Sequence, residues 1–108
     1  MISFAIAADG SLSDRRLFVR LTALGEDSGA YPDGLKLGPD GNLYVGQYSS
    51  GRILVVAADG SLVTSHDTGT AAAPNLAFSA DGATLVATVV DNLAGPPYEG
   101  RVVALPLE

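Results

Sequence analysis

Short apolar runs recur along the chain, and an Asp-Gly pair separates one run from the next in four places. These pairs lie at 9–10, 40–41, 59–60 and 81–82, as in "ILVVAADGSLV". Glycine readily adopts positive φ and aspartate tolerates it, so Asp-Gly between strand-like runs predicts a β-hairpin. The periodicity of a helix fits no segment of about ten residues. The sequence therefore predicts an all-β fold of about nine short strands.

The predicted strands repeat with a period of about 41 residues. The segment "LGPDGNLYV" at 37–45 matches "FSADGATLVA" at 78–87, and "GRILVV" at 51–56 matches "GRVVAL" at 100–105. A repeat of about 40–45 residues that holds four strands is typical of a propeller blade. The whole chain, 1–108, is therefore predicted to be a partial β-propeller of about two four-stranded antiparallel blades.

The repeats divide the chain into three parts. Residues 1–24 supply two strands of one blade, 34–67 a complete blade and 75–108 three strands of the next. The runs 53–56 and 85–87 are continuously apolar, as expected of strands covered on both faces by neighbouring blades. Two blades and a part cannot close a ring, and repeats of this kind bury their core only against neighbours. We therefore expect self-association or pairing with a missing half of the propeller.

Composition narrows the classes of function. Six basic and twelve acidic residues give a net charge of −6, which argues against nucleic acid and anionic membranes as partners. The chain has no cysteine, and its single histidine, His66, excludes a His-rich zinc site. No apolar run approaches the ~20 residues of a membrane span, and the N-terminus lacks the pattern of a signal peptide. A cytoplasmic location is the default expectation.

Pro-Asp-Gly occurs twice, at 32–34 and 39–41, and the two copies are predicted to differ. Asp40 lies between two strand-like runs, which predicts a two-residue hairpin turn. Asp33 follows the polar loop "GEDSGAY" at 25–31 and precedes the innermost strand of the complete blade. In a propeller that position opens onto the central channel, where ligand sites form. A loop carboxylate satisfied by local amides is the structural alternative for Asp33.

The stretch "YPDGLKLGPDGNLYVGQYSSGRILVVAADGSLV", preceded by "SFAIAADGSLSDRRLFVRL", resembles the C-terminal half of the gluconolactonase/regucalcin (senescence marker protein) family. The resemblance covers most of the chain. It implies a six-bladed propeller with a divalent metal in the central channel. The Asp of the family's Pro-Asp-Gly is a metal ligand that is essential for hydrolysis, and this role maps to Asp33. The family's other two protein ligands have no counterpart here.

The resemblance implies metal-dependent hydrolysis of a lactone or a related sugar-acid ester, with calcium or zinc as the cation. Asn75 lies one position after the alignment partner of Asp33, which makes it a second candidate ligand. One carboxylate is insufficient, because calcium takes ~6–8 oxygen ligands and a catalytic zinc has about three protein ligands. We therefore expect the cation, and with it the activity, only where other residues complete the site.

The alternative is a non-catalytic propeller piece of the NHL-repeat type, used for binding or scaffolding. Such repeats also carry Pro-Asp-Gly, a second turn and an Arg-Ile strand. The upstream segment "DGSLSDRRLFVRL" suits the gluconolactonase family better, and the long insertion "VDNLAGPPYEG" departs from a tight repeat.

Overall fold

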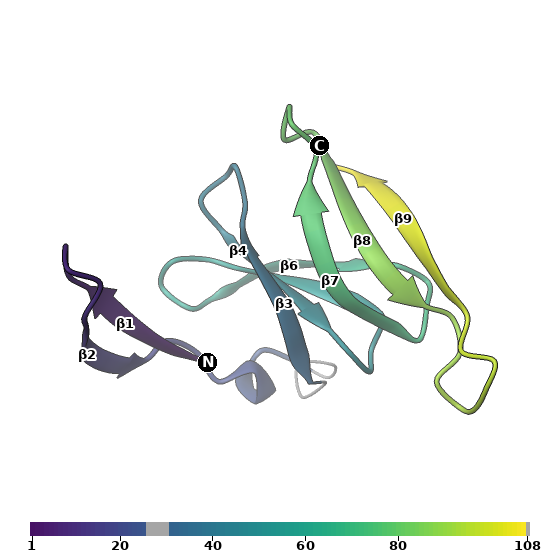
Figure 1. Cartoon of the computed structure of the whole chain (residues 1–108), viewed down its shortest axis with the longest axis horizontal. Coiled ribbons are helices and arrows are strands. Elements are labelled where there is room, and N and C mark those ends of the chain that lie inside the picture. Colours follow the sequence, from purple (N-terminus) through teal and green to yellow (C-terminus); the bar gives the residue numbers. More distant parts are fainter. Residues whose placement is uncertain (26–30, 108) are drawn as a thin grey trace.

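The computed structural model describes residues 1–25 and 31–107, so most of the polar loop predicted at 25–31 lies outside the described residues. Nine strands and one 3-10 turn, Leu21–Ala23, make up the regular structure of this part (Figure 1). The prediction of an all-β chain is confirmed. The strands are β1 (Ile2–Ile6), β2 (Leu12–Leu17), β3 (Pro32–Leu37), β4 (Leu43–Gln47), β5 (Arg52–Val56), β6 (Leu62–Asp67), β7 (Ala72–Phe78), β8 (Thr84–Val90) and β9 (Gly100–Pro106).

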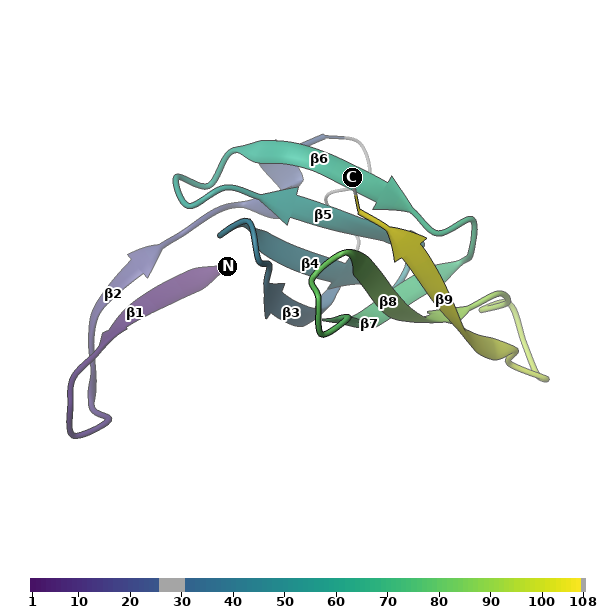
Figure 2. The same cartoon turned by 90° about the horizontal axis from the view of Figure 1, so that it is seen from above.

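The strands form three antiparallel units. β3, β4, β5 and β6 pair in chain order, and we call them the central sheet. β7, β8 and β9 form a second unit, joined to the central sheet where Gln47 of β4 pairs with Ala73 of β7. β1 and β2 form a separate hairpin that projects from the central sheet (Figure 2).

The four Asp-Gly turns share one geometry. In each, the aspartate Oδ1 accepts a hydrogen bond from the amide two residues later, at 2.9–3.1 Å. The glycine that follows has a φ between 71° and 86°, which a side chain disfavours. The prediction of a two-residue turn at Asp40 is wrong in length. Gly38 and Asn42 close the loop through a hydrogen bond of 2.8 Å, so three residues form the turn, and the positive-φ glycine accommodates the extra residue.

Two apolar clusters form the core, one on each face of the central sheet. Between the central sheet and β7–β9, Ile53 and Val55 pack with Leu85 and Ala87. On the opposite face, a second cluster joins the central sheet to the segment that follows β2, and it comprises Val19, Leu21, Val45, Leu54 and Val56. The continuously apolar residues 53–56 of β5 therefore contribute to both clusters. Burial on both faces explains why no polar residue follows Arg52 in this strand.

Two glycines allow β7 to cross close to β3 and β4. A Cβ added at Gly46 of β4 would lie 2.6 Å from the carbonyl oxygen of Ala73 and 2.7 Å from that of Pro74. A Cβ added at Gly34 of β3 would lie 2.8 Å from the same Pro74 oxygen. Real Cβ atoms do not approach so closely, so any side chain would push the strands apart. Figure 1 shows β3 and β7 side by side at this crossing.

Replacement of Gly46 by alanine should therefore destabilise the fold. We expect a loss of about 1–3 kcal/mol from overpacking, more than the ~0.4–1 kcal/mol gained by stiffening the unfolded chain. Gly95→Ala is the matched control, because nothing lies within 4 Å of a Cβ built there. Urea denaturation followed by circular dichroism measures both variants. Equal midpoints for Gly46→Ala and Gly95→Ala would contradict the close approach.

Candidate functional site

Asp33 is the second residue of β3 and its side chain is exposed. The strand begins at Pro32, two residues earlier than the predicted start at residue 34, so the first Pro-Asp-Gly lies within a strand. Gly34 is not among the glycines with positive φ. The pairing of β3 with β4 shifts register between Pro32 and Leu35, which interrupts the regular ladder at Asp33. Such irregularities re-aim side chains and are frequent beside active sites.

The same irregularity recurs in the next innermost strand. The pairing of β7 with β8 shifts register between Ala72 and Asn75. With the offset of about 41 residues between repeats, this position corresponds to the shift in β3. Two neighbouring strands therefore carry a matching break at the same end. This coincidence singles out that end of the sheet as a candidate site.

Asn75 is exposed and lies directly beside the first Pro-Asp-Gly. A Cβ added at Gly34 would be 2.5 Å from the Asn75 Oδ1 atom, which shows how closely the amide rests on the β3 backbone. The same oxygen accepts a hydrogen bond of 2.9 Å from the amide of Leu76. A carbonyl oxygen has a second lone pair, which can bind a further donor or a cation. The structure thus places both candidate ligands, Asp33 and Asn75, on adjacent strands at one end.

A buried polar residue supports this end of the sheet. Gln47 ends β4, has no exposed surface and pairs with Ala73 of β7. Its Oε1 atom accepts a hydrogen bond of 2.8 Å from the Ser50 hydroxyl. Just beyond it, the amide of Tyr48 donates to the carbonyl of Tyr31 at 2.8 Å. Gln47 could not be identified from the sequence, because a single glutamine after an apolar run reveals nothing of its burial.

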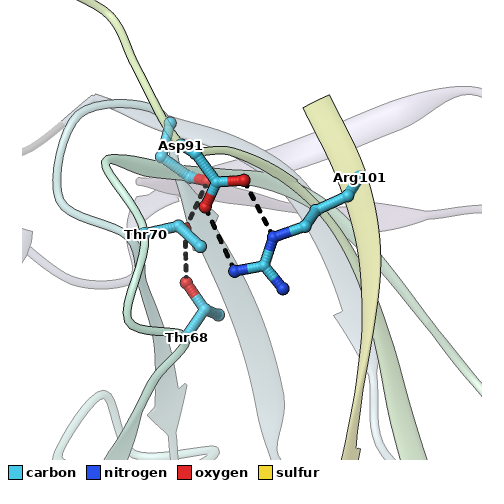
Figure 3. Close-up of polar contacts among 5 residues, drawn as sticks. Thr68, Thr70, Asp91 and Arg101 are labelled. Atoms are coloured by element: carbon cyan, nitrogen blue, oxygen red, sulfur yellow. Dashed lines mark hydrogen bonds and ion pairs between the residues drawn. The ribbon is translucent and has the colours of Figure 1, made fainter. Parts of the chain in front are cut away.

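An ion pair fixes the same end of β8 and β9. Arg101 donates two hydrogen bonds to the Asp91 carboxylate, from Nε at 2.8 Å and from a terminal nitrogen at 3.1 Å (Figure 3). This arrangement holds the pKa of Asp91 below its ordinary value. Nearby, the hydroxyls of Thr68 and Thr70 lie 2.6 Å apart, and Thr70 donates to the Ala72 carbonyl at 3.0 Å (Figure 3). These contacts anchor the chain where it enters β7.

Asp40 lies beyond the other end of β3, in a turn. Its carboxylate accepts hydrogen bonds from the Asn42 amide at 3.1 Å, the Asn42 side chain at 2.8 Å and the Tyr44 hydroxyl at 3.1 Å. Burial favours the neutral acid, but these bonds outweigh it, and the pKa of Asp40 lies below its ordinary value. Burial and then Asp40 itself raise the pKa of Tyr44. The two Pro-Asp-Gly copies therefore have different structural roles.

The residues of one chain do not fit a complete cation site. Asp33 and Asn75 supply one carboxylate and one amide oxygen, fewer than the ~6–8 oxygen ligands of calcium. Within residues 1–25 and 31–107, no three His, Asp or Glu side chains gather closely enough to hold a metal ion. His66 belongs to β6, where its ring stacks on Tyr44 at 6.2 Å between centroids. The arrangement can therefore contribute ligands to a shared site.

Comparison with known proteins establishes the family. Residues 1–91 match the family described as SMP-30/Gluconolactonase/LRE-like region. The match extends over most of the chain, and the chain belongs to this family. The resemblance inferred from the sequence is thereby confirmed. No curated protein matches the chain.

Two solved structures share the fold. A luciferin-regenerating enzyme superimposes with a TM-score of 0.75 at 19% identity, over 95% of this chain and 36% of that enzyme. A gluconolactonase from Xanthomonas campestris, important in glucose secondary metabolic pathways, superimposes with a TM-score of 0.66 at 26% identity. The superposition covers 99% of this chain and 30% of that gluconolactonase. The chain thus spans about a third of these proteins, and the predicted partial propeller is confirmed.

The described residues contain no helix long and apolar enough to cross a membrane.

The bonds of Asp40 predict a pH-dependent contribution to stability. Asp40→Ala should lower the free energy of unfolding at pH 7 by about 1 kcal/mol, because it removes hydrogen bonds to a charged group. A lowered pKa stabilises the fold above the unfolded pKa of about 4, and this contribution is lost as the pH falls through the folded pKa. Urea midpoints of wild type and variant should therefore converge in acid. Asp33→Ala is the control, with an unchanged midpoint expected; a constant gap for Asp40→Ala down to pH 2 would contradict the assignment.

Proposed function

We propose that this chain provides part of the active face of a propeller that hydrolyses a lactone or a related sugar-acid ester with the help of a divalent cation. Family membership and the likeness to a gluconolactonase at 26% identity support this proposal. The observation that carries it is the position of Asp33. It is an exposed carboxylate at the start of an innermost strand, at a break in the ladder that β7 repeats beside it.

In the proposed reaction, water adds to the lactone carbonyl carbon, the ring C–O bond breaks and the ring oxygen takes up a proton. A divalent cation, calcium or zinc, would polarise the carbonyl when bound. Asp33 would contribute one carboxylate ligand to that cation, and Asn75 one amide oxygen. The contact between Gly34 of β3 and the Asn75 side chain of β7 would keep the two ligands in a fixed relation, because β7 cannot move toward β3 without a clash at this contact.

The remaining ligands and the rest of the channel wall must come from outside this single copy of the chain. A single carboxylate holds a divalent cation weakly, so the isolated chain is expected to have little or no activity. Activity should appear when a propeller is completed, by further copies or by a chain that supplies the other blades. This requirement distinguishes the proposal from a scaffolding role, in which completion would bring no hydrolysis.

The test compares the aspartates of the two Pro-Asp-Gly copies, Asp33 and Asp40. In the completed assembly, Asp33→Ala should abolish the cation-dependent hydrolysis of δ-gluconolactone, while Asp40→Ala should retain it and only lower stability. Acid release measured in a pH-stat gives the rate, with spontaneous hydrolysis subtracted. Calorimetric titration with Ca²⁺ or Zn²⁺ provides a readout independent of turnover, and Asp33→Ala should lose binding there also.

Two results would overturn the proposal. Equal rates for the Asp33→Ala and wild-type assemblies would remove Asp33 from the chemistry. Robust turnover by a verified monomer would show that completion of the site is unnecessary.

A further inference from the structure

One side of the central sheet presents an open apolar surface, which we call the leading face. Leu35 and Leu37 of β3 are 46% and 72% exposed, although they pair with Val45 and Leu43, whose side of the sheet carries a core cluster. A groove of about 370 Å³ lies over this surface. Its lining includes Met1, Ile2, Phe18, Leu35, Leu37 and Leu43. The apolar surface of the cluster that contains Val45, Leu54 and Val56 therefore continues onto β3, where no other part of the described chain covers it.

The outer side of β7–β9 presents a second open surface, which we call the trailing face. Leu85, Ala87 and Val89 of β8 are buried toward the central sheet, so the residues between them point outward. Val86 pairs with Ala104 and Ala77, and Thr88 pairs with Val102 and Asn75. Val102 is 65% exposed. The Asn75 amide rests on the β3 backbone at Gly34, so the open face comprises Ala77, Val86, Thr88, Val102 and Ala104.

The trailing face is uncharged, in a chain of 18 charged side chains with a net charge of −6. Solvated sheet faces usually carry charges, whereas uncharged faces of small apolar residues are typical of packed interfaces. Figure 2 shows the hairpin β1–β2 on one flank of the central sheet and β7–β9 on the other. The groove of the leading face lies toward β1–β2, because Met1 and Ile2 line it, and the trailing face is the outer side of β7–β9. Two complementary surfaces on opposite flanks favour a head-to-tail contact between copies over a two-fold dimer.

We infer that copies of this chain associate head to tail, with the trailing face of one copy packed on the leading face of the next, and that three copies close a ring. The chain already contains one such contact, because β7 and β8 cover the other side of its central sheet. The solved propellers are about three times as long, with 36% and 30% of their length matched. Three copies therefore supply the length of one propeller. Each junction would hold β7–β9 of one copy beside β1–β2 of the next.

A closed ring of three copies would also bear on the candidate site. Each copy would bring one Asp33 and one Asn75 to the same end of the ring, at the innermost strands β3 and β7. Three carboxylates and three amide oxygens approach the number of donors that calcium takes. This consequence rests on the proposed function, whereas the association itself does not.

Two single substitutions, one on each face, test the inference. Leu37→Asp blocks the leading face and Ala104→Asp the trailing face; both positions are exposed, so the fold should persist, as circular dichroism can verify. Light scattering on a sizing column should give wild type three times the 11.0 kDa of one chain, and each variant the mass of a monomer. Val102→Lys is a second trailing-face variant. Val63→Asp, exposed on β6 outside both faces, is the control and should stay trimeric.

Mixing the two variants gives the decisive result. The Leu37→Asp chain keeps its trailing face and the Ala104→Asp chain keeps its leading face, so an equimolar mixture should form a heterodimer through the one intact contact. Three results would overturn the inference. They are a monomeric wild type, a mixture of the two variants that stays monomeric, and a wild-type dimer that only one of the two substitutions dissociates. These masses do not depend on catalysis. A trimer without lactone hydrolysis would therefore refute the proposed function and leave the association intact.

Discussion

The close crossing of β7 over β3 and β4 is the contact on which the rest of the structure depends. It is possible only because Gly34 and Gly46 have no side chain. A Cβ at Gly34 would lie 2.5 Å from the Asn75 Oδ1 atom, and one at Gly46 would lie 2.6 Å from the carbonyl oxygen of Ala73. The crossing brings Leu85 and Ala87 onto Ile53 and forms one of the two core clusters. Dispersion and apolar burial then stabilise an arrangement that the two glycines permit.

The same crossing positions the candidate site. Each innermost strand has a register break near its first residues, and the two breaks lie side by side because the strands do. Asp33 and Asn75 therefore lie close together although 42 positions separate them in the sequence. Around them, Gln47 is buried with a hydrogen bond from Ser50, and the Asp91–Arg101 pair fixes the ends of β8 and β9. The cation-assisted hydrolysis proposed above would require such a rim, because ligands must be held in place before the substrate arrives.

Local chemistry made much of the fold predictable. The Asp-Gly turns can be recognised in the sequence because one aspartate and one glycine satisfy the turn geometry without distant partners. The apolar run of β5 likewise indicates burial on both faces. The position of Asp40 in a turn was also predictable from the strand-like runs on either side of it. Gln47 and Arg101 were not, since their partners are set by strand pairing between distant segments. The length of the Asp40 turn was missed because the Asp-Gly signal covers only two residues, and the hydrogen bond between Gly38 and Asn42 is what adds Pro39 to the loop.

The placement of a cation is the central claim, and paramagnetic broadening tests it directly. Substoichiometric Mn²⁺ added to uniformly ¹⁵N-labelled protein broadens the amide signals nearest to the bound ion. The account predicts that the signals of Asp33, Gly34, Asn75 and Leu76 broaden first, even if binding to a single chain is weak. The turn aspartates Asp9, Asp59 and Asp81 offer equally exposed carboxylates and serve as internal controls. Broadening that begins at those turns, with the signals of β3 and β7 still sharp, would contradict the account.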